Sequence, residues 1–347
     1  MDLKERISSF SLTGDIIRNA LEGGKGKYET LLSELIHNQY INNPWFTPGN
    51  VRLSLFSAAS MLEPGKLAKW ISAYPGLNEE RDPVDVGVIM AGNIPLVGFH
   101  DFLCVLMTGN NIIARTSSKD RDLIRVIAEI LCSVNSGFKG RIKFTDSQLK
   151  GFNAVIATGS DNSARYFEYY FAKYPSIIRK NRNSVAILTG DESAGEIKEL
   201  ATDFFSFFGL GCRNISKIFI PAGTEPDEIT QGWDHYSGIM DHSKYANNYD
   251  YNKAVFLVNR IPFRDAGFML LRESPDLSSP VSVLNYEFYD SAETVYGILG
   301  KNRDKIQCII GQDHVPFGTS QMPELWDYPD NIDIIDFLLK KNHGRVY

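Results

Sequence analysis

A single cysteine, Cys212, lies on a glycine-rich turn where the sequence passes from an expected helix into an expected strand. The run before it ends in Gly209-Leu210-Gly211, and glycine lets a backbone turn tightly and approach a ligand closely. A thiolate at such a turn is a strong nucleophile that can form covalent acyl intermediates. Arg213 beside it would favour the thiolate by its charge. The alternative is that Cys212 is one more small buried hydrophobic residue.

Asn93 lies in a turn, Gly92-Asn93-Ile94-Pro95, which follows an apolar run ending at Met90. Ligands of open parallel sheets bind at the carboxyl ends of the strands, where such turns lie. We expect Asn93 at the start of a helix, where its side-chain N–H would suit the stabilisation of an oxyanion. The alternative is a helix cap or a turn residue, which is the commoner use of asparagine.

Three further segments carry polar residues that suit a nucleotide. Arg115-Thr116-Ser117-Ser118 follows the next expected strand, and its cation and hydroxyls could hold a ribose or a 2′-phosphate. Thr158-Gly159-Ser160 opens a helix, where a phosphate or a nicotinamide could approach the helix dipole. Asp276, on a later loop, could hold a ribose hydroxyl. The alternative for residues 115–118 is a solvated loop, and that for residues 158–160 is an ordinary capped turn. The alternative for Asp276 is a solvent-exposed acid without a ligand.

The elements that must position these residues alternate between strand and helix. Residues 1 to about 80 are expected to be helical, because leucines recur there at helical spacing. The expected strands are 84–90, 111–114, 154–158, 184–189, 217–221, 251–259, 266–271 and 281–286. The expected helices are 95–107, 120–133 with Asp120 as its cap or near-cap, 161–174, 191–208, and a short one that ends the segment 327–341. Strands alternating with helices indicate a parallel sheet with crossover helices.

The composition excludes several classes of protein. A chain of 347 residues with 43% hydrophobic and 22% charged residues is typical of a soluble globular protein with a large core. The net charge of −6, without a basic stripe, argues against nucleic-acid binding. Four widely spaced cysteines and six histidines without paired spacing predict neither a disulfide framework nor a metal site.

Further segments of the sequence suggest where the protein is located in the cell and which side chains are exposed or buried. We expect a cytoplasmic protein, because the N-terminus lacks the apolar stretch of a signal peptide and no apolar segment reaches the ~18 residues that span a bilayer. The basic cluster Arg179, Lys180 and Arg182 is expected to be solvated, with contact to a phosphate-bearing cofactor or coenzyme A as the alternative. Four phenylalanines are expected to form helical core, namely Phe204, Phe205, Phe207 and Phe208.

Taken in their order along the chain, these features resemble the aldehyde dehydrogenase superfamily. The run GNIPLVGFHDFLCVLMTGNNIIARTS is similar to the family's Asn-Phe-Pro and Lys-Pro-Ser-Glu segments, GLGCRN to its catalytic cysteine segment, and DLSSPV to its Glu-x-Phe-Gly-Pro-Val segment. The tail FGTSQMPELWDYPDNIDIIDFL resembles acyl-CoA reductases of the bacterial bioluminescence fatty-acid reductase type. The resemblance covers about residues 84–340, and the Cys212 segment is its most specific part.

The resemblance implies an aldehyde-dehydrogenase-like α/β fold, with a Rossmann-like parallel-sheet cofactor domain and a second α/β catalytic domain. The expected domains are an N-terminal helical region packing on the cofactor domain (1–80), a nucleotide-binding domain (81–182), a catalytic domain carrying Cys212 (183–310), and a C-terminal segment returning to the cofactor domain or an oligomer interface (311–347). A homo-oligomer is implied by the resemblance alone, and an acyl-transferring partner protein is left open.

The resemblance also implies an activity, the NAD(P)H-dependent reduction of an acyl-CoA thioester to an aldehyde. Cys212 would be the nucleophile and Asn93 the oxyanion donor. The residues implied to hold the cofactor are Arg115, Ser117, Ser118, Thr158, Gly159, Ser160 and Asp276. Coenzyme A would be part of the substrate, and a fatty acyl chain is the expected acyl group. A reductase of acyl phosphates and a catalytically silent nucleotide-binding scaffold remain as alternatives.

Departures from the family pattern refine these expectations. The family's water-activating glutamate, upstream of the cysteine, has no counterpart in SIIRKNRNSVAIL, residues 176–188. Hydrolysis of a thioester would need such a base, so we expect the acyl-cysteine to be reduced instead. Ser118 replaces an expected acid, which removes repulsion toward a 2′-phosphate and favours NADPH over NADH. Arg115 stands for a lysine, and Asp276 for a glutamate one methylene longer.

Overall fold

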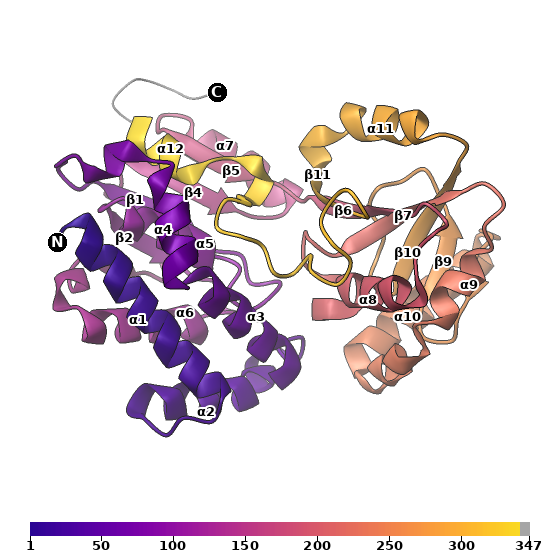
Figure 1. The fold of residues 1–347 in the computed structure, drawn as a ribbon, viewed down its shortest axis with the longest axis horizontal. Helices are drawn as coiled ribbons and strands as arrows, with labels where there is room; N and C mark the ends of the chain where they lie inside the picture. The colour runs from indigo at the N-terminus through magenta and orange to yellow at the C-terminus, as the bar shows by residue number, and fades with distance from the viewer. Residues whose placement is uncertain (341–347) are drawn as a thin grey trace. The chain divides into compact units, whose positions relative to one another are not determined.

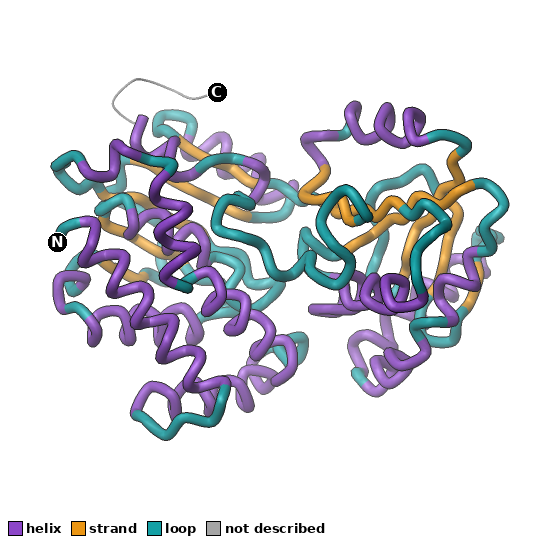
Figure 2. Tube along the Cα trace, in the orientation of Figure 1, coloured by secondary structure: helices purple, strands orange, loops and turns teal. Residues whose placement is uncertain are grey.

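The computed structural model describes residues 1–340, which form two compact units. The first unit comprises Met1–Asn181 and the described residues from Pro323 onward, and the second comprises Arg182–Met322. Each unit has its own sheet with helices around it (Figure 2). The last seven residues of the expected C-terminal segment, including the end of its expected helix, lie outside the described residues.

Four helices form the N-terminal part of the first unit (Figure 1): α1 (Leu3–Leu21), α2 (Lys27–Asn42), α3 (Pro48–Met61) and α4 (Pro64–Ser72). The expected helical character of residues 1 to about 80 is therefore confirmed. Local chemistry sets where these helices begin. Asp2 and Glu5 form a capping box at α1, and Pro48 and Pro64 each occupy a first helical turn, where proline is tolerated. Throughout residues 1–340, the structure contains no helix that combines the length and apolarity needed to cross a membrane.

The first unit contains a five-stranded parallel sheet in the order β3-β2-β1-β4-β5. Its strands are β1 (Asp85–Ile89), β2 (Asn111–Arg115), β3 (Ile142–Phe144), β4 (Ala154–Thr158) and β5 (Ser176–Arg179). The chain moves to one side of β1 through α5 (Phe99–Met107) and α6 (Asp122–Val134), and to the other side through β4 and α7 (Asp161–Phe171). The strand order therefore reverses between β1 and β4, which is where ligands bind in such sheets.

Both faces of this sheet are covered. Val88 and Ile156 pack in the main core, which α5, α6 and the N-terminal helices share. Val155 points to the opposite face and packs with Phe167 of α7, because successive residues of a strand face opposite sides. The C-terminal helix α12 (Ile334–Leu339) returns to this unit and adds Ile335 to the main core.

The second unit contains a six-stranded sheet in the order β11-β6-β7-β10-β9-β8, in which only the β8–β9 pairing is antiparallel. Its strands are β6 (Asn183–Ile187), β7 (Ile215–Pro221), β8 (Arg264–Asp265), β9 (Leu270–Glu273), β10 (Val283–Tyr289) and β11 (Ile306–Ile310). Its helices are α8 (Ala194–Phe205), α9 (Pro226–Gln231), α10 (Ser243–Val258) and α11 (Ala292–Lys301). Helix α11 lies on one face of the sheet, and α8 and α10 lie on the other (Figure 1). The expected α/β class is thus confirmed in both units.

Some expected elements differ from the structure. The strand expected at 251–259 is wrong, since these residues lie almost entirely in α10. The helix forms because Tyr245, Tyr249, Asn252 and Phe256 recur at helical spacing and bury one face, which outweighs the short apolar run AVFLV. The strand expected at 266–271 is shifted, because β9 covers Leu270–Glu273.

Candidate active site

Cys212 lies in the turn between the end of α8 and β7. Helix α8 ends at Phe205, because Phe207 (φ 51°), Phe208 (φ 57°) and Gly209 (φ 76°) all adopt the left-handed conformation. A residue other than glycine in this region costs about 1–3 kcal/mol, so the surroundings must hold the segment in place. The two phenylalanines are buried, as expected for core, but they are not helical.

Asn214 holds this turn together. Its side chain is 3% exposed, and its Nδ2 donates to the carbonyl oxygens of Asp203 at 2.9 Å and Ser206 at 2.8 Å. Its Oδ1 accepts the N–H of Gly211 at 2.8 Å. A helix leaves its last carbonyls without partners inside the helix, so one amide both closes α8 and fixes the turn that carries Cys212. Sequence reasoning missed Asn214, although it lies within the GLGCRN motif.

Asp203 anchors a second segment beside the same turn. It is fully buried in α8, and its two carboxylate oxygens accept the N–H groups of Gly318 at 2.7 Å and Ser320 at 2.9 Å. Burial raises the pKa of Asp203, and the hydrogen bonds from Ser320 and Gly318 partly offset that rise. Arg213 then donates from Nε to the Ser320 carbonyl at 2.6 Å, which holds the guanidinium on this segment. An acid within the apolar run ATDFFSFF was the signal that could have revealed Asp203.

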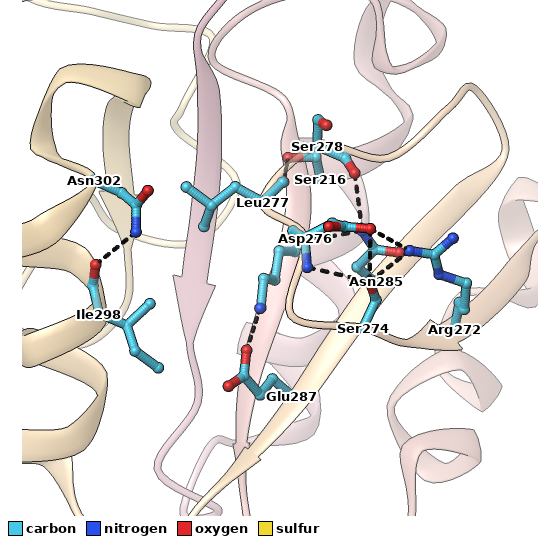
Figure 3. A network of polar contacts seen from close by, with 11 residues as sticks. Ser216, Arg272, Ser274, Asp276, Leu277, Ser278, Asn285, Glu287, Ile298 and Asn302 are labelled. Atoms are coloured by element: carbon cyan, nitrogen blue, oxygen red, sulfur yellow. Dashed lines mark hydrogen bonds and ion pairs between the residues drawn. The ribbon is translucent and has the colours of Figure 1, made fainter.

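The loop that carries Asp276 is fixed by the strands beneath it (Figure 3). Asn285 of β10 donates to the main-chain carbonyls of Asp276 at 3.1 Å and Ser278 at 2.9 Å. Arg272 donates to Oδ2 of Asp276 at 2.6 Å, so the exposed carboxylate has a fixed position. A cavity of about 690 Å³ adjoins the loop, and its lining includes Arg272, Asp276 and Glu287.

Hydrogen bonds through Ser184 link the Cys212 turn to this loop. The Ser184 hydroxyl donates to the Cys212 carbonyl at 2.8 Å, and the Ser184 carbonyl accepts the hydroxyl of Ser216 at 3.3 Å. The Ser216 hydroxyl also donates to the carbonyl of Leu277, next to Asp276, at 2.6 Å. Within the second unit, β6 and β7 therefore connect the backbone of the Cys212 turn to the backbone of the loop that carries Asp276.

Lys217 of β7 is a further buried charge in this unit that sequence reasoning missed. It is completely buried and forms an ion pair with Glu287 of β10. Burial lowers the pKa of Lys217, and Glu287 and Asp276 partly offset that effect. Its place within an otherwise apolar strand, ISKIFIP, is the sequence signal for a paired internal cation.

The other expected cofactor residues lie in the first unit, at the carboxyl ends of β2 and β4. Arg115 ends β2 and is exposed, as is Ser118, whereas Ser117 is half-buried. Thr158 ends β4, and Ser160 is the N-cap of α7, with its hydroxyl oxygen accepting the N–H of Ser163 at 3.3 Å. These residues flank the point where the strand order reverses.

Gly159 allows the chain to enter α7 tightly. A Cβ at this position would lie 2.8 Å from Cβ of Ser163 and 2.9 Å from the ring of Phe167, closer than real Cβ atoms approach. Glycine at this turn therefore brings the backbone against the first turn of α7, as the expected phosphate-binding role requires.

The placement expected for Asn93 at a helix start is wrong, and Asp120, which lies near the start of the next helix as expected, does not act as its cap. Asn93 lies in a turn, and α5 begins only at Phe99, so Asn93 is not at a helix start. Asp120 does not cap the next helix, which begins at Asp122. It is instead 5% exposed and accepts the N–H of Leu96 on its Oδ2 at 2.7 Å. Burial raises the pKa of the Asp120 carboxyl to about 7; the hydrogen bond from Leu96 partly offsets the rise, and nearby Asp122 adds to it.

The expectation that the whole basic cluster is solvated is also wrong. Arg179, at the end of β5, is 3% exposed and donates to the carboxylate of Asp101 in α5 at 2.7 Å. Lys180 does lie at the surface, where it pairs with Glu168. Arg179 is therefore a buried cation within residues 176–188, the segment where the family would place its water-activating acid.

Comparison of the sequence with protein-family models and with curated proteins yields no match. Several solved structures share the fold, at low sequence identity. An NADP-dependent enzyme of E. coli is 13% identical with a TM-score of 0.63, and the match covers 89% of this chain and 73% of the E. coli chain. An NAD-dependent benzaldehyde dehydrogenase of Corynebacterium glutamicum is 12% identical with a TM-score of 0.61, covering 88% and 77%. A Mycobacterium tuberculosis aldehyde dehydrogenase, complexed with NAD+, is 16% identical with a TM-score of 0.59, covering 83% and 70%.

These similarities establish the fold of the chain. It is aldehyde-dehydrogenase-like, with a Rossmann-like parallel sheet in the first unit and a second α/β unit that carries Cys212. The expectation drawn from the order of the sequence motifs is therefore confirmed at the level of fold.

Proposed function

We propose that this protein is an NAD(P)H-dependent acyl-CoA reductase that converts an acyl thioester into an aldehyde through an acyl intermediate on Cys212. One observation carries the proposal. The Cys212 turn is held by the buried Asn214, whereas residues 176–188 contain no carboxylate, and Arg179 of that segment is committed to a buried ion pair. A held nucleophile without a water-activating base in that segment suits reduction of an acyl-enzyme rather than its hydrolysis.

In the proposed first step, the Cys212 thiolate attacks the carbonyl carbon of the thioester and forms a new C–S bond. Collapse of the tetrahedral adduct breaks the bond to coenzyme A, which leaves as a thiolate and takes up a proton. The resemblance implies the backbone N–H of Cys212 and the Asn93 amide as donors that would stabilise the oxyanion. Arg213 lies next in sequence, and we propose that its positive charge favours the thiolate.

The polar residues at the carboxyl ends of β2 and β4 fit a phosphorylated nicotinamide cofactor. Arg115 and Ser118 are exposed on one loop, and the N-cap Ser160 opens an α-helix of 11 residues. NADPH bound by these residues, with NADH as the alternative, would supply the hydride for the acyl carbon. The C–S bond to Cys212 would then break, which releases the aldehyde and restores the Cys212 thiolate. Asp276, whose carboxylate is positioned by Arg272, would hold a ribose hydroxyl.

The test is NADPH oxidation by the purified protein with a series of acyl-CoA thioesters of increasing chain length. We expect oxidation coupled to release of coenzyme A, and we expect Cys212→Ser to lower the rate by roughly 10³-fold or more. Cys132→Ser, which alters a half-buried cysteine of α6, should retain the rate. The chain-length profile would identify the substrate class, for which we propose a fatty acyl group.

Two outcomes would overturn the proposal. Oxidation with acyl phosphates but not with thioesters would identify an acyl-phosphate reductase. Binding of the nucleotide without turnover of either substrate would indicate a silent scaffold, in which Cys212 would also react slowly with iodoacetamide at neutral pH.

A further inference from the structure

Two loops of the first unit meet beside the point where its strand order reverses. The N–H of Met90, at the end of β1, donates to the carbonyl of Arg115, at the end of β2, at 3.0 Å. A Cβ at Gly92 would lie only 2.6 Å from Oγ of Ser117, so the backbone of the first loop lies directly against the second. The position of the turn that carries Asn93 therefore depends on the loop 115–120.

A side chain adds a specific link between the two loops. Leu96, three residues after Asn93, has a φ of 59°, a left-handed conformation that leucine rarely adopts. Its N–H donates to Oδ2 of Asp120 at 2.7 Å, and its carbonyl accepts the N–H of Phe99 at 2.9 Å. Asp120 thus fixes the residue that connects the Asn93 turn to helix α5.

A carboxylate is an unusual choice for this contact. Asp120 is 5% exposed, and within the described residues its Oδ1 has no hydrogen-bond partner. A buried, half-satisfied carboxylate is strongly disfavoured, and a neutral side chain would avoid most of that penalty. What the carboxylate adds is a short, charge-assisted hydrogen bond to a backbone N–H, which is stronger and better oriented than a neutral one.

We propose that Asp120 is a positioning residue that fixes the Asn93 turn through the Leu96 N–H and so holds the Asn93 amide ready for the oxyanion. This inference rests on the proposed function, in which Asn93 is the oxyanion donor. Preorganised donors stabilise a transition state because they need no rearrangement during the reaction. A loosened turn would leave substrate binding intact and slow the chemical step.

The experiment compares Asp120→Ala, Asp120→Asn and the control Asp122→Ala in the full chain. For acyl-CoA reduction we expect Asp120→Ala to lower kcat by about 10- to 100-fold, with KM for both substrates changed by less than about twofold. Asp120→Asn retains an acceptor oxygen for Leu96 but loses the charge, so it should recover part of kcat. Combined with Asn93→Ala, Asp120→Ala should lower kcat no further, because it acts through Asn93.

Hydrogen exchange of the segment 92–98 gives a readout that is independent of activity. We expect faster exchange there in Asp120→Ala than in the wild type, Asp120→Asn or Asp122→Ala. Unchanged exchange and unchanged kcat in Asp120→Ala would overturn the inference, as would an equal loss of kcat in Asp120→Asn. If the wild type reduces no thioester while Asp120→Ala still loosens segment 92–98, the positioning of the turn stands and the proposed function fails.

Discussion

The turn that carries Cys212 and the turn that carries Asn93 are each held by one buried polar side chain, but the two side chains differ in chemistry. Asn214 is a neutral amide that uses both its donor and its acceptor, closing α8 and binding Gly211. Asp120 is an acid that accepts one backbone N–H on one oxygen. A neutral amide keeps the same hydrogen bonds across the pH range, whereas an acid changes its protonation state, and its hydrogen bond to a backbone N–H is stronger when the acid is ionised.

The largest effect should come from the amide. Asn214→Ala would leave the N–H of Gly211 and two carbonyls at the end of α8 without their partner. Each buried polar group left unpaired costs about 1–3 kcal/mol, so we expect a loss of roughly 4 kcal/mol in the free energy of unfolding of the second unit. Urea denaturation measures this loss, and Asn38→Ala on the exposed surface of α2 is the control. Equal stability of the two variants would show that Asn214 does not hold the turn.

Removal of the proposed oxyanion donor should affect the rate rather than the fold. In Asn93→Ala we expect acylation by an acyl-CoA to slow by about 10²- to 10³-fold, since one oxyanion donor is worth that much in comparable sites. Release of coenzyme A in a single turnover measures the step, and urea denaturation should match that of the wild type. An acylation rate in Asn93→Ala equal to that of the wild type would show that Asn93 is not an oxyanion donor. The comparison of its turn with the Cys212 turn as two parts of one site would then fail.

The acid should also make stability depend on pH. Because burial raises the pKa of Asp120 from 3.8 to about 7, the folded chain holds this proton more tightly than the unfolded chain does. The resulting stabilisation is present in full below the unfolded pKa and is lost as the pH rises to about 7. Relative to Asp120→Asn, we expect the wild type to lose roughly 2–3 kcal/mol between pH 5 and pH 8. Parallel curves of unfolding free energy against pH would contradict this reading of Asp120.

The smallest effect concerns an exposed position of the same loop. Ser118→Glu would place a carboxylate where the cofactor's 2′-phosphate is proposed to lie, two residues from the buried Asp120. We expect the affinity for NADPH to fall by about tenfold relative to NADH, because like charges repel weakly near solvent. Titration of both nucleotides measures the ratio, and Ser118→Gln is the matched uncharged control. An unchanged ratio would place the 2′-phosphate elsewhere.

The sequence predicts the strands of the two sheets better than it predicts how loops are fixed. Short apolar runs gave β1, β2, β4, β6 and β7 their expected places, because buried parallel strands are nearly continuous in hydrophobicity. Residues 251–259 mislead, since the buried face of α10 includes Tyr245, Tyr249 and Asn252, all three of which lie outside the apolar run AVFLV. The helical spacing of this buried face can be recognised only when its polar and aromatic residues are counted together with the aliphatic ones.

The residues that support the candidate site could not be predicted from local sequence patterns. Asp120 precedes an amphipathic helix and so looks like a cap, yet its partner Leu96 lies 24 residues earlier. Arg179 looks like part of a surface cluster, yet its partner Asp101 lies 78 residues earlier. Neither spacing follows a helical or strand period, so local patterns cannot reveal the pairing.

The Arg179–Asp101 ion pair has a consequence for redesign of this protein as an aldehyde-oxidising catalyst. The obvious step is to introduce a glutamate near the end of β5, where the family places its water-activating acid. If that glutamate replaced Arg179, it would leave Asp101 buried beside a second acid, and breaking a buried pair in this way costs about 3–5 kcal/mol. If the glutamate is placed at Arg179, Asp101 must therefore be changed together with it, so that this design needs at least two substitutions.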